Sequence, residues 1–200
     1  MSRGGSIVGA AMSLIAASLC GCVARSPMTV SESFANPHPR AVNPPGTARR
    51  NERAAGCPLI VDAITDTRSD PAILGTVAGR AVHAPANSGT WLQNVVAGFD
   101  SRDIDVSFDA NTAHEATPLI ASLTLRIAWV SDIHTSKTAN ALWHMRLRRG
   151  ETQLVDADFR GADTALNWSS GDGELQRMVD RALGKALDLM ADEVHAACGH

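Results

Sequence analysis

The stretch Leu119-Ile120-Ala121-Ser122-Leu123-Thr124-Leu125-Arg126-Ile127-Ala128-Trp129 decides the fold of this chain. Every second position in it is apolar, namely Leu119, Ala121, Leu123, Leu125, Ile127 and Trp129. The polar residues that stand between them are Ser122, Thr124 and Arg126. Because successive side chains of a strand point to opposite faces of a sheet, this alternation predicts a half-buried strand with Ile127 and Trp129 on its dry face.

Two further segments continue the sheet downstream. The second repeats the alternation, with Ala141, Trp143, Met145 and Leu147 on one side and Asn140, His144, Arg146 and Arg148 on the other. Arg149-Gly150-Glu151 then predicts a turn into a third strand over residues 153–160. Together the three segments predict an antiparallel meander with one face in water.

A long amphipathic helix is predicted after the loop at residues 169–173. Its apolar stripe consists of Leu175, Met178, Val179, Ala182, Leu183, Ala186, Leu187, Met190 and Val194. A stripe of this width is typical of a helix that lies on the dry face of a sheet.

Shorter elements precede the meander. Residues 59–64 are apolar and β-branched and predict a buried strand, and residues 73–82 favour a weak strand. After a loop at residues 84–89, Thr90 is the predicted N-cap of a helix, and residues 104–108 follow as a short strand. The predicted fold is α+β: a two-layer sandwich whose antiparallel-rich sheet carries two main helices on one face.

The N-terminus has the organisation of a secretory signal peptide over residues 1–21. Arg3 precedes an apolar segment, Ile7 to Leu19, which is shorter than the roughly 20 residues that span a bilayer. Leu19-Cys20-Gly21-Cys22 resembles a bacterial lipobox, which implies cleavage before Cys22 and attachment of acyl chains such as palmitate to it. The alternative is an ordinary signal peptide cleaved near residues 16–18.

By the same resemblance, Val23 in place of Asp implies sorting to the outer membrane, with the protein facing the periplasm. Residues 22–56 are rich in proline and arginine and predict a flexible tether behind the lipidated Cys22. Residues 57–200 are the predicted periplasmic domain.

Composition and motifs argue against two classes of function, nucleic-acid binding and catalysis. The formal net charge is −3 and the chain has no Tyr, which argues against a nucleic-acid partner. The sequence contains no nucleophile elbow, phosphate loop or zinc-protease motif, so we expect neither an enzyme nor a cofactor.

Three small groups of polar residues allow a chemical or a structural interpretation. His195-x-x-Cys198-x-His200 has a spacing that a metal could use, but a fraying C-terminal tail is the favoured interpretation, and no metal is expected. Asp156 and Asp158 share one face of a strand, where we interpret them as solvated rather than as an acid–base pair. Asp66 and Arg68 in the first turn predict an ion pair or a cap.

With Cys22 acylated, Cys57 and Cys198 remain in an oxidising compartment, which favours a disulfide. They stand at the start of the first strand and at the end of the last helix. These two ends meet if the helix runs antiparallel to the strand. Closing so long a loop stabilises a fold by about 4–5 kcal/mol in the chain-entropy model. The alternative is two free thiols.

With the lipobox in front, the order of these elements resembles the YajG-like family of bacterial lipoproteins and, more distantly, the PqiC-like auxiliary lipoproteins of envelope ABC-type transport systems. The matching segments are Leu59-Ile60-Val61, Asp66-Thr67-Arg68, residues 91–96, Leu123-Thr124-Leu125, Phe159-Arg160-Gly161 and residues 174–192. The resemblance implies a two-layer domain without a known catalytic activity. Ser101-Arg102-Asp103 stands where members often place glycine after the first helix.

These observations favour a lipid-anchored envelope protein that acts by binding, as an accessory of envelope assembly or transport. Arg126, Arg146 and Arg148 on the wet sheet face are the expected contact surface for a partner protein, because arginine is enriched at interfaces. The alternative is a small-ligand or cell-wall binding module with a cleft beside residues 84–89. An envelope hydrolase ranks last.

Overall fold

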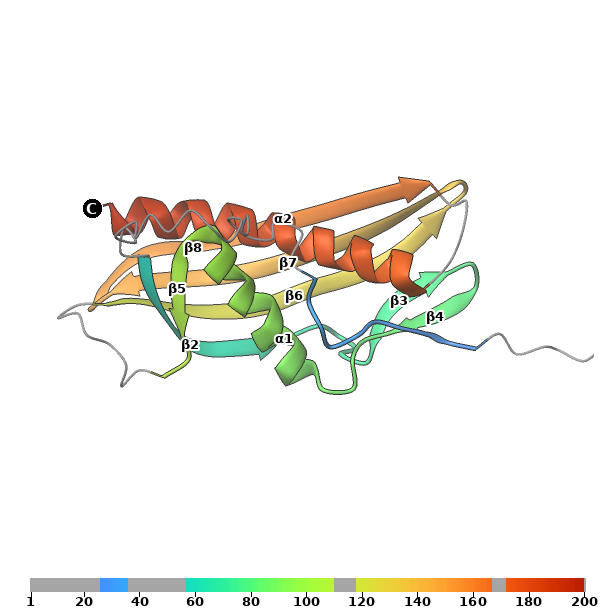
Figure 1. Ribbon diagram of the computed structural model, residues 1–200, viewed down its shortest axis with the longest axis horizontal. Coiled ribbons are helices and arrows are strands. Elements are labelled where there is room, and N and C mark those ends of the chain that lie inside the picture. The colour runs from blue at the N-terminus through green and yellow to red at the C-terminus, as the bar shows by residue number, and fades with distance from the viewer. Residues whose placement is uncertain (1–25, 36–56, 110–117, 167–171, 200) are drawn as a thin grey trace, which may run out of the picture.

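The computed structural model describes residues 26–35, 57–109, 118–166 and 172–199. Their strands are β1 (Met28–Thr29), β2 (Cys57–Asp66), β3 (Ile73–Val77), β4 (Arg80–His83), β5 (Ile104–Ser107), β6 (Leu119–Ile133), β7 (Ser136–Arg149) and β8 (Thr152–Leu166). Their helices are α1 (Ser88–Val96), the 3₁₀ helix η1 (Ala97–Arg102) and α2 (Asp172–Cys198). All eight strands belong to one sheet, and the helices lie on one face of it (Figure 1).

Strand β6 is the centre of the sheet. On one side it pairs with β7 along its whole length, and β7 pairs with β8, so that the three form an antiparallel meander. On the other side two shorter strands share its edge: β2 runs parallel to residues 119–125, and β3 runs parallel to Val130-Ser131. β5 extends the sheet beyond β2, while β4 and β1 extend it beyond β3. This confirms the predicted α+β sandwich and its antiparallel-rich meander.

The core lies between the meander and α2. The apolar stripe of α2 is buried, and so are the inward-facing side chains of β6 and β7, among them Leu123, Leu125, Trp143 and Met145. The sheet and α2 approach each other closely at Gly161 of β8, where an added Cβ would overlap the carbonyl oxygen of Ala182 and lie 2.7 Å from the Ala186 nitrogen. Glycine is therefore required at this crossing, because any side chain would push the helix away from the sheet.

The prediction for β6 is wrong beyond Leu125. A β-bulge interrupts its pairing with β7 between Leu125 and Ile127, so Arg126 is an extra residue. A one-residue slip moves every following side chain to the other face of the sheet. Ile127 and Trp129 are consequently 43% and 47% exposed, whereas Ala128 and Val130 are buried.

The tether prediction is wrong for residues 26–35, which belong to the fold. Strand β1 pairs with β4, and the Val30 amide donates to the His83 carbonyl at 3.0 Å. Met28 and Val30 are buried, and Phe34 packs beside Gly98, where an added Cβ would lie 2.8 Å from its ring. The tether prediction missed this segment because its apolar side chains are buried only once the rest of the sheet has formed. The remaining residues of the predicted tether, and the signal peptide, lie outside the described residues.

Helix α1 begins one turn earlier than predicted. Its N-cap is Asn87, whose side chain accepts a hydrogen bond from the Thr90 amide at 3.1 Å, so Thr90 lies inside the helix. At the end of η1, Asp103 adopts the left-handed conformation with φ of 58°. Aspartate tolerates this conformation better than most residues, so it does here what glycine commonly does after a helix.

The two ends of the domain are held together by a disulfide between Cys57 and Cys198, whose Cα atoms lie 6.0 Å apart. This is the predicted pairing. Arg102 adds a second tie between η1 and α2, because its guanidinium donates to Asp188 at 2.7 Å and to the Gly184 carbonyl at 3.0 Å. Cys57, Arg102 and Cys198 thus hold β2, η1 and α2 at one end of the molecule.

Candidate functional site

The three arginines of the predicted contact surface lie on the open face of the sheet, opposite the helices. Arg146 and Arg148 point there because they alternate with buried Met145 and Leu147 along β7. Arg126 lies at the bulge of β6 and is also exposed. The exposed fractions of the three side chains are 44% for Arg126, 66% for Arg146 and 45% for Arg148.

Each arginine faces a carboxylate, and the face is therefore not simply basic. Arg126 Nη1 lies 2.8 Å from an Asp158 carboxylate oxygen, Arg146 Nε lies 3.4 Å from Asp156, and Arg148 Nη2 lies 3.7 Å from Asp62. Such exposed pairs contribute at most about 1 kcal/mol each to stability. Their alternating charges suit specific recognition of a complementary surface better than general attraction of anions.

His144 connects two of these pairs. Its Nδ1 lies 2.8 Å from Asp158 and its Nε2 lies 3.1 Å from Asp156, while its side chain is only 13% exposed. The register explains this, since His144 pairs across the strands with Asp158 and Arg146 pairs with Asp156. Nδ1 is within hydrogen-bond distance of Asp158, whereas Nε2 is buried and makes no hydrogen bond, although an Asp156 oxygen lies 3.1 Å away.

Asp156 and Asp158 lie on a solvent-exposed face, as the sequence interpretation has it, but they also form pairs that it did not predict. Both are partly exposed, at 39% and 43% of the side chain, but both are engaged by cations and by the imidazole. The sequence did contain a signal for these pairs. His144 and Arg146 are two residues apart on one predicted strand, and Asp156 and Asp158 are two residues apart on the next. Only the register of the hairpin, which a second bulge near Arg148 shifts, brings these side chains together.

Asp66 and Arg68 form the predicted ion pair. Arg68 donates from Nε to one carboxylate oxygen at 2.9 Å and from Nη2 to the other at 2.7 Å, and it lies 5.5 Å from the centre of the Trp91 ring. A bidentate pair stacked on a buried aromatic ring fixes the turn after β2 against α1. This is a structural contact, because the guanidinium is buried.

A second group of polar contacts fastens residues 31–35 to α2. The Gln176 side chain accepts from the Ser31 amide at 2.7 Å and donates to Asp180 at 2.9 Å, and the Ala35 amide donates to Asp180 at 3.3 Å. Asp180 is 1% exposed. Its burial raises the pKa from the usual 3.8 to about 6, although the hydrogen bonds from Gln176 and Ala35 work in the opposite direction.

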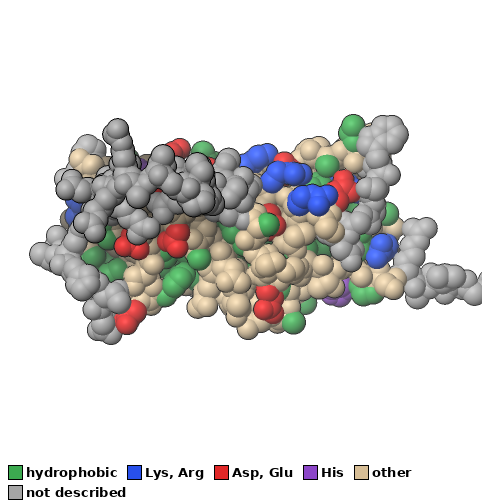
Figure 2. Space-filling view, viewed as in Figure 1, with side chains coloured by type: hydrophobic (Ala, Val, Ile, Leu, Met, Phe, Trp, Pro, Cys, Tyr) green, Lys and Arg blue, Asp and Glu red, His purple; other side chains and the backbone are tan. Residues whose placement is uncertain are grey.

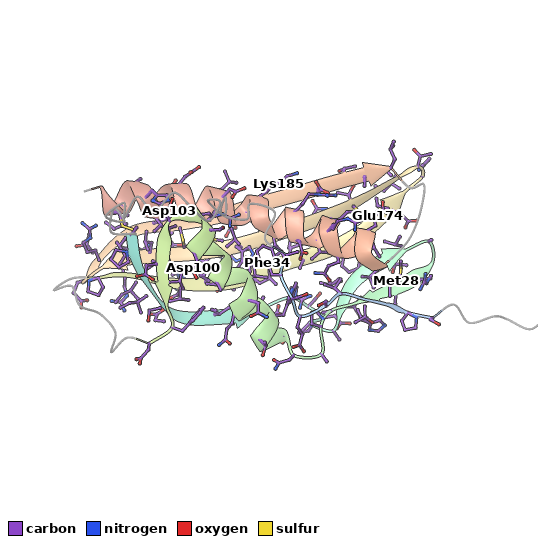
Figure 3. All side chains as sticks on the ribbon, viewed as in Figure 1. Met28, Phe34, Asp100, Asp103, Glu174 and Lys185 are labelled. Atoms are coloured by element: carbon purple, nitrogen blue, oxygen red, sulfur yellow. A yellow bond between two sulfur atoms is a disulfide. The ribbon has the colours of Figure 1, made fainter. Side chains whose placement is uncertain are left out.

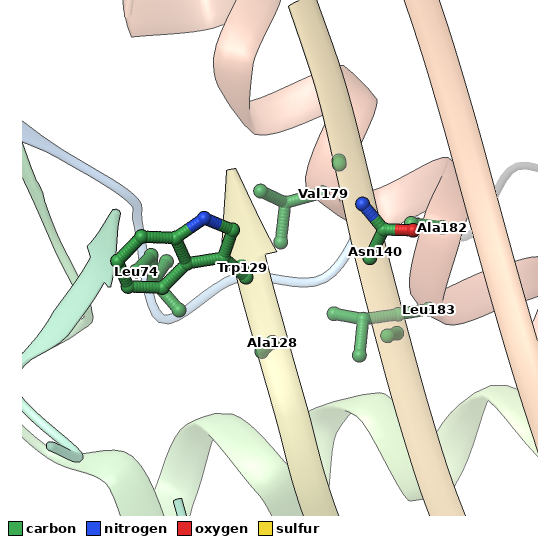
Figure 4. Close-up of a pocket in the computed structure, with 9 residues that line it drawn as sticks. Leu74, Ala128, Trp129, Asn140, Val179, Ala182 and Leu183 are labelled. Atoms are coloured by element: carbon green, nitrogen blue, oxygen red, sulfur yellow. The ribbon is translucent and has the colours of Figure 1, made fainter. Parts of the chain in front are cut away.

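A small pocket lies between β3, β6, β7 and α2, lined by Leu74, Ala128, Ala141, Val179 and Leu183 among others (Figure 4). Its volume of about 10 Å³ holds at most one water molecule. It is also far too small for a typical ligand. It does not include the loop at residues 84–89, so it gives no support to the ligand-binding alternative proposed for that loop.

The helix-covered face carries a different set of charges. Figure 2 shows Lys and Arg side chains gathered along α2. Arg181 and Lys185 of this helix both pair with Asp163 of β8, at 2.8 Å and 3.1 Å. These contacts fasten α2 to the edge strand and give a comparison surface for the open face.

Other predicted features have simple outcomes in the described part of the chain. His195 Nε2 lies 2.8 Å from the Arg102 carbonyl oxygen, and no cluster of three metal-binding side chains occurs among the described residues. Within the same residues, no helix is long and apolar enough to cross a membrane. Cys22 and His200 lie outside them.

No protein-family model and no curated protein matches this sequence. Solved structures with a similar course of the chain include XCC0632 of Xanthomonas campestris, a DUF330 protein, at 12% identity and a TM-score of 0.49 over 86% of this chain and 97% of that one. A minor lipoprotein of Acinetobacter baumannii is 8% identical over 71% of this chain and 92% of that one, with a TM-score of 0.41. Lipoprotein GNA1162 of Neisseria meningitidis is 12% identical over 70% of this chain and 99% of that one, with a TM-score of 0.30.

These structural neighbours are thus a protein without a named activity and two bacterial lipoproteins, all at low identity. Likeness at this level assigns the chain to no family, and the resemblance to the YajG-like and PqiC-like families stays a prediction.

Proposed function

We propose that this protein is a bacterial envelope lipoprotein, held by acyl chains on Cys22, that acts by binding a protein partner in the periplasm. The observation that carries the proposal is the Leu19-Cys20-Gly21-Cys22 sequence behind an apolar segment, placed four residues before Ser26, where the described fold begins. The disulfide between Cys57 and Cys198 supports it, because such bonds persist in oxidising compartments. By the same proposal the protein is sorted to the outer membrane, since Val23 and not Asp follows Cys22.

The partner-binding surface in this proposal is the open face around Arg126, Arg146 and Arg148. A face of alternating arginine and aspartate side chains offers hydrogen-bond donors and acceptors in a fixed pattern. Arginine side chains at such positions commonly carry much of the binding energy of an interface. The accessory role in envelope assembly or transport that we propose follows the resemblance of the sequence to the YajG-like and PqiC-like lipoproteins.

The anchor is tested by metabolic labelling with a palmitate analogue and by membrane fractionation. The full-length chain should take up label and float with the outer membrane, and a Cys22→Ala form should do neither. Label that persists in Cys22→Ala would contradict lipidation at this residue. Recovery of the labelled chain in the inner membrane would contradict only the sorting.

Binding is tested by crosslinking the anchored chain in cells, followed by capture and mass spectrometry of proteins and lipids. The double variant Arg146→Glu with Arg148→Glu should lose the dominant crosslinked protein. Arg181→Glu with Lys185→Glu is the matched control, because it reverses two paired cations of similar exposure on the helix-covered face. Equal capture by both variants would refute the open face as the contact, and an enriched wall fragment without a protein would favour the ligand-binding alternative.

A further inference from the structure

We propose that the end of the domain that carries Ser26 rests on the membrane surface, with Ile133, Leu166 and Trp129 in contact with the lipid headgroup region. This inference rests on the proposed lipid attachment at Cys22. It adds a second membrane contact, made by the folded domain itself, and a fixed orientation of the open face.

Only a short stretch of chain separates the proposed anchor at Cys22 from the fold. Ser26 is held in place, because its carbonyl accepts a hydrogen bond from Arg80 Nε at 2.8 Å and Met28 pairs with Val82 two residues later. Cys22 precedes Ser26 by four residues, which span at most about 14 Å when fully extended. The acylated end of the chain therefore keeps this part of the domain within reach of the headgroups, whereas a tether up to residue 56 would have left it free.

The second step is the set of elements that share this end. The Ala78 amide in the β3–β4 turn donates to Asp132 near the tip of β6 at 3.0 Å. Ile133 pairs with Ser136, and Ser136 pairs with Leu166 at the end of β8. In Figure 1 the start of the described chain, the β3–β4 turn and the ends of β6 and β8 all lie at one end of the long axis, and Figure 3 labels Met28 and Glu174 there.

The third step is the apolar surface at this end. Ile133 is 63% exposed and Leu166 is 60% exposed, and they flank Ser136 on the same face. Ile127 and Trp129 follow along β6, turned outward by the bulge at Arg126. Exposed side chains of this size in one strip are unusual on a soluble protein, and tryptophan is the residue that favours membrane interfaces.

The open face is thus divided along its length. The half near Cys57 carries the pairs of Arg126, Arg146 and Arg148 and the partly buried imidazole of His144. From the bulge to the tip of the hairpin, the outward-facing residues of β6 and β7 are uncharged: Ile127, Trp129, Ser131, Ile133, Ser136, Thr138, Asn140 and Leu142. Arg160 of β8 lies beside Leu142 and donates to Asn140 at 2.8 Å, so it borders this uncharged strip. Desolvating the charged residues would be costly, while the tip of the strip around Ile133 and Leu166 loses little on entering the interface.

These steps favour a lipid surface over a second copy of the chain as the occupant. The apolar strip lies at the end where the acylated residue must lie, and the arginine–aspartate pairs of the open face lie toward the other end. Three or four partly exposed side chains add only modest membrane affinity, so the acyl chains hold the protein and the strip sets its orientation. The paired charges then face the periplasm, where a partner can reach them.

The test uses the full-length acylated protein in vesicles of phosphatidylethanolamine and phosphatidylglycerol, with one environment-sensitive fluorophore on an introduced cysteine. Probe sites are Ile133→Cys and Leu166→Cys, and matched controls are Leu154→Cys and Leu189→Cys, whose native side chains are 43% and 48% exposed elsewhere on the domain. The emission at 133 and 166 should shift to shorter wavelength and should be lost in vesicles containing brominated lipids. The emission at 154 and 189 should be lost only with iodide in the water.

Flotation of the same vesicles tests the lipid anchor separately from the membrane contact of the folded domain. A chain that floats but shows iodide quenching at 133 and 166 overturns the inference and leaves the lipid anchor intact. A chain that floats and shows protection at 133 without quenching by brominated lipid indicates a second copy on the strip, which also overturns it. A chain that does not float overturns the anchor and the inference together.

Discussion

Replacing Asp180 with asparagine should stabilise the protein at neutral pH, and the size of the effect follows from the structure. The carboxyl group is buried where residues 31–35 meet α2, and its pKa is raised from 3.8 to about 6. Each pKa unit corresponds to about 1.36 kcal/mol, so ionisation of Asp180 opposes folding by about 3 kcal/mol. Asparagine removes the charge but can accept only one of the two hydrogen bonds from Gln176 and Ala35, which costs about 1 kcal/mol.

The stabilisation by Asp180→Asn should depend on pH, because only the ionised form of Asp180 opposes folding. Below pH 3.8 Asp180 is protonated in the folded and the unfolded chain, and its charge has no influence on stability. Between pH 3.8 and 6 the unfolded chain releases the proton while the folded chain keeps it, so the stability of the native protein falls as the pH rises. Above pH 6 the full penalty is present, and Asp180→Asn should be more stable than the native protein by about 2 kcal/mol.

The assay is urea unfolding across this pH range with the disulfide intact, followed by the fluorescence of buried Trp91 and Trp143. Hydrogen exchange at the Ser31 amide, which donates to Gln176, reports the same change locally, as slower exchange in the variant above pH 6. Asp192→Asn is the control, because Asp192 is exposed on the same helix. A difference between Asp180→Asn and the native protein that stays constant with pH would refute the reasoning.

Two further changes test the packing and the covalent closure of the fold. Gly161→Ala should destabilise by about 3 kcal/mol, because its Cβ would meet the backbone of α2, whereas Gly89→Ala, with its nearest neighbour at 3.6 Å, should leave the urea midpoint nearly unchanged. Equal midpoints for the two variants would contradict the close crossing of β8 and α2. Replacing Cys57 and Cys198 together by alanine opens a loop with a sequence separation of 141 and should cost about 5 kcal/mol in the chain-entropy model. Mass spectrometry after thiol alkylation without reductant checks the bond directly, and two alkylated thiols in the native protein would exclude it.

The structure gives the proposed lipid anchor a different mechanical role from the one that the composition suggested. A proline-rich tether of more than thirty residues would let the domain move freely above the membrane. The packing of residues 26–35 on β4 and α2 places the start of the fold next to Cys22 instead. A short connection of this kind makes the shape and polarity of one end of the domain relevant to function.

Local sequence patterns were enough to predict the main elements and their layering. The alternation through Leu119 to Leu125 and through Ala141 to Leu147, together with the apolar stripe of α2, is local and unambiguous, and it predicted the meander and the helix upon it. The disulfide was also predicted from the sequence, because Cys57 and Cys198 stand at the two ends of the domain and the N-terminal segment implies export to an oxidising compartment.

Three features depend on the tertiary structure. They are the choice of which side chains of β6 face the core beyond Leu125, the position of residues 26–35, and the pairs around His144. All four residues from 127 to 130 are apolar, so their pattern does not show which two face the core. The β-bulge at Arg126, where the pairing of β6 with β7 shifts by one residue, turns Ile127 and Trp129 toward water. Residues 26–35 have no partner until β4 and α2 are in place, and His144 meets its aspartates only through the register of β7 with β8. The physical reason is common to the three: each depends on contacts between residues far apart in the chain, which no local pattern of side chains encodes.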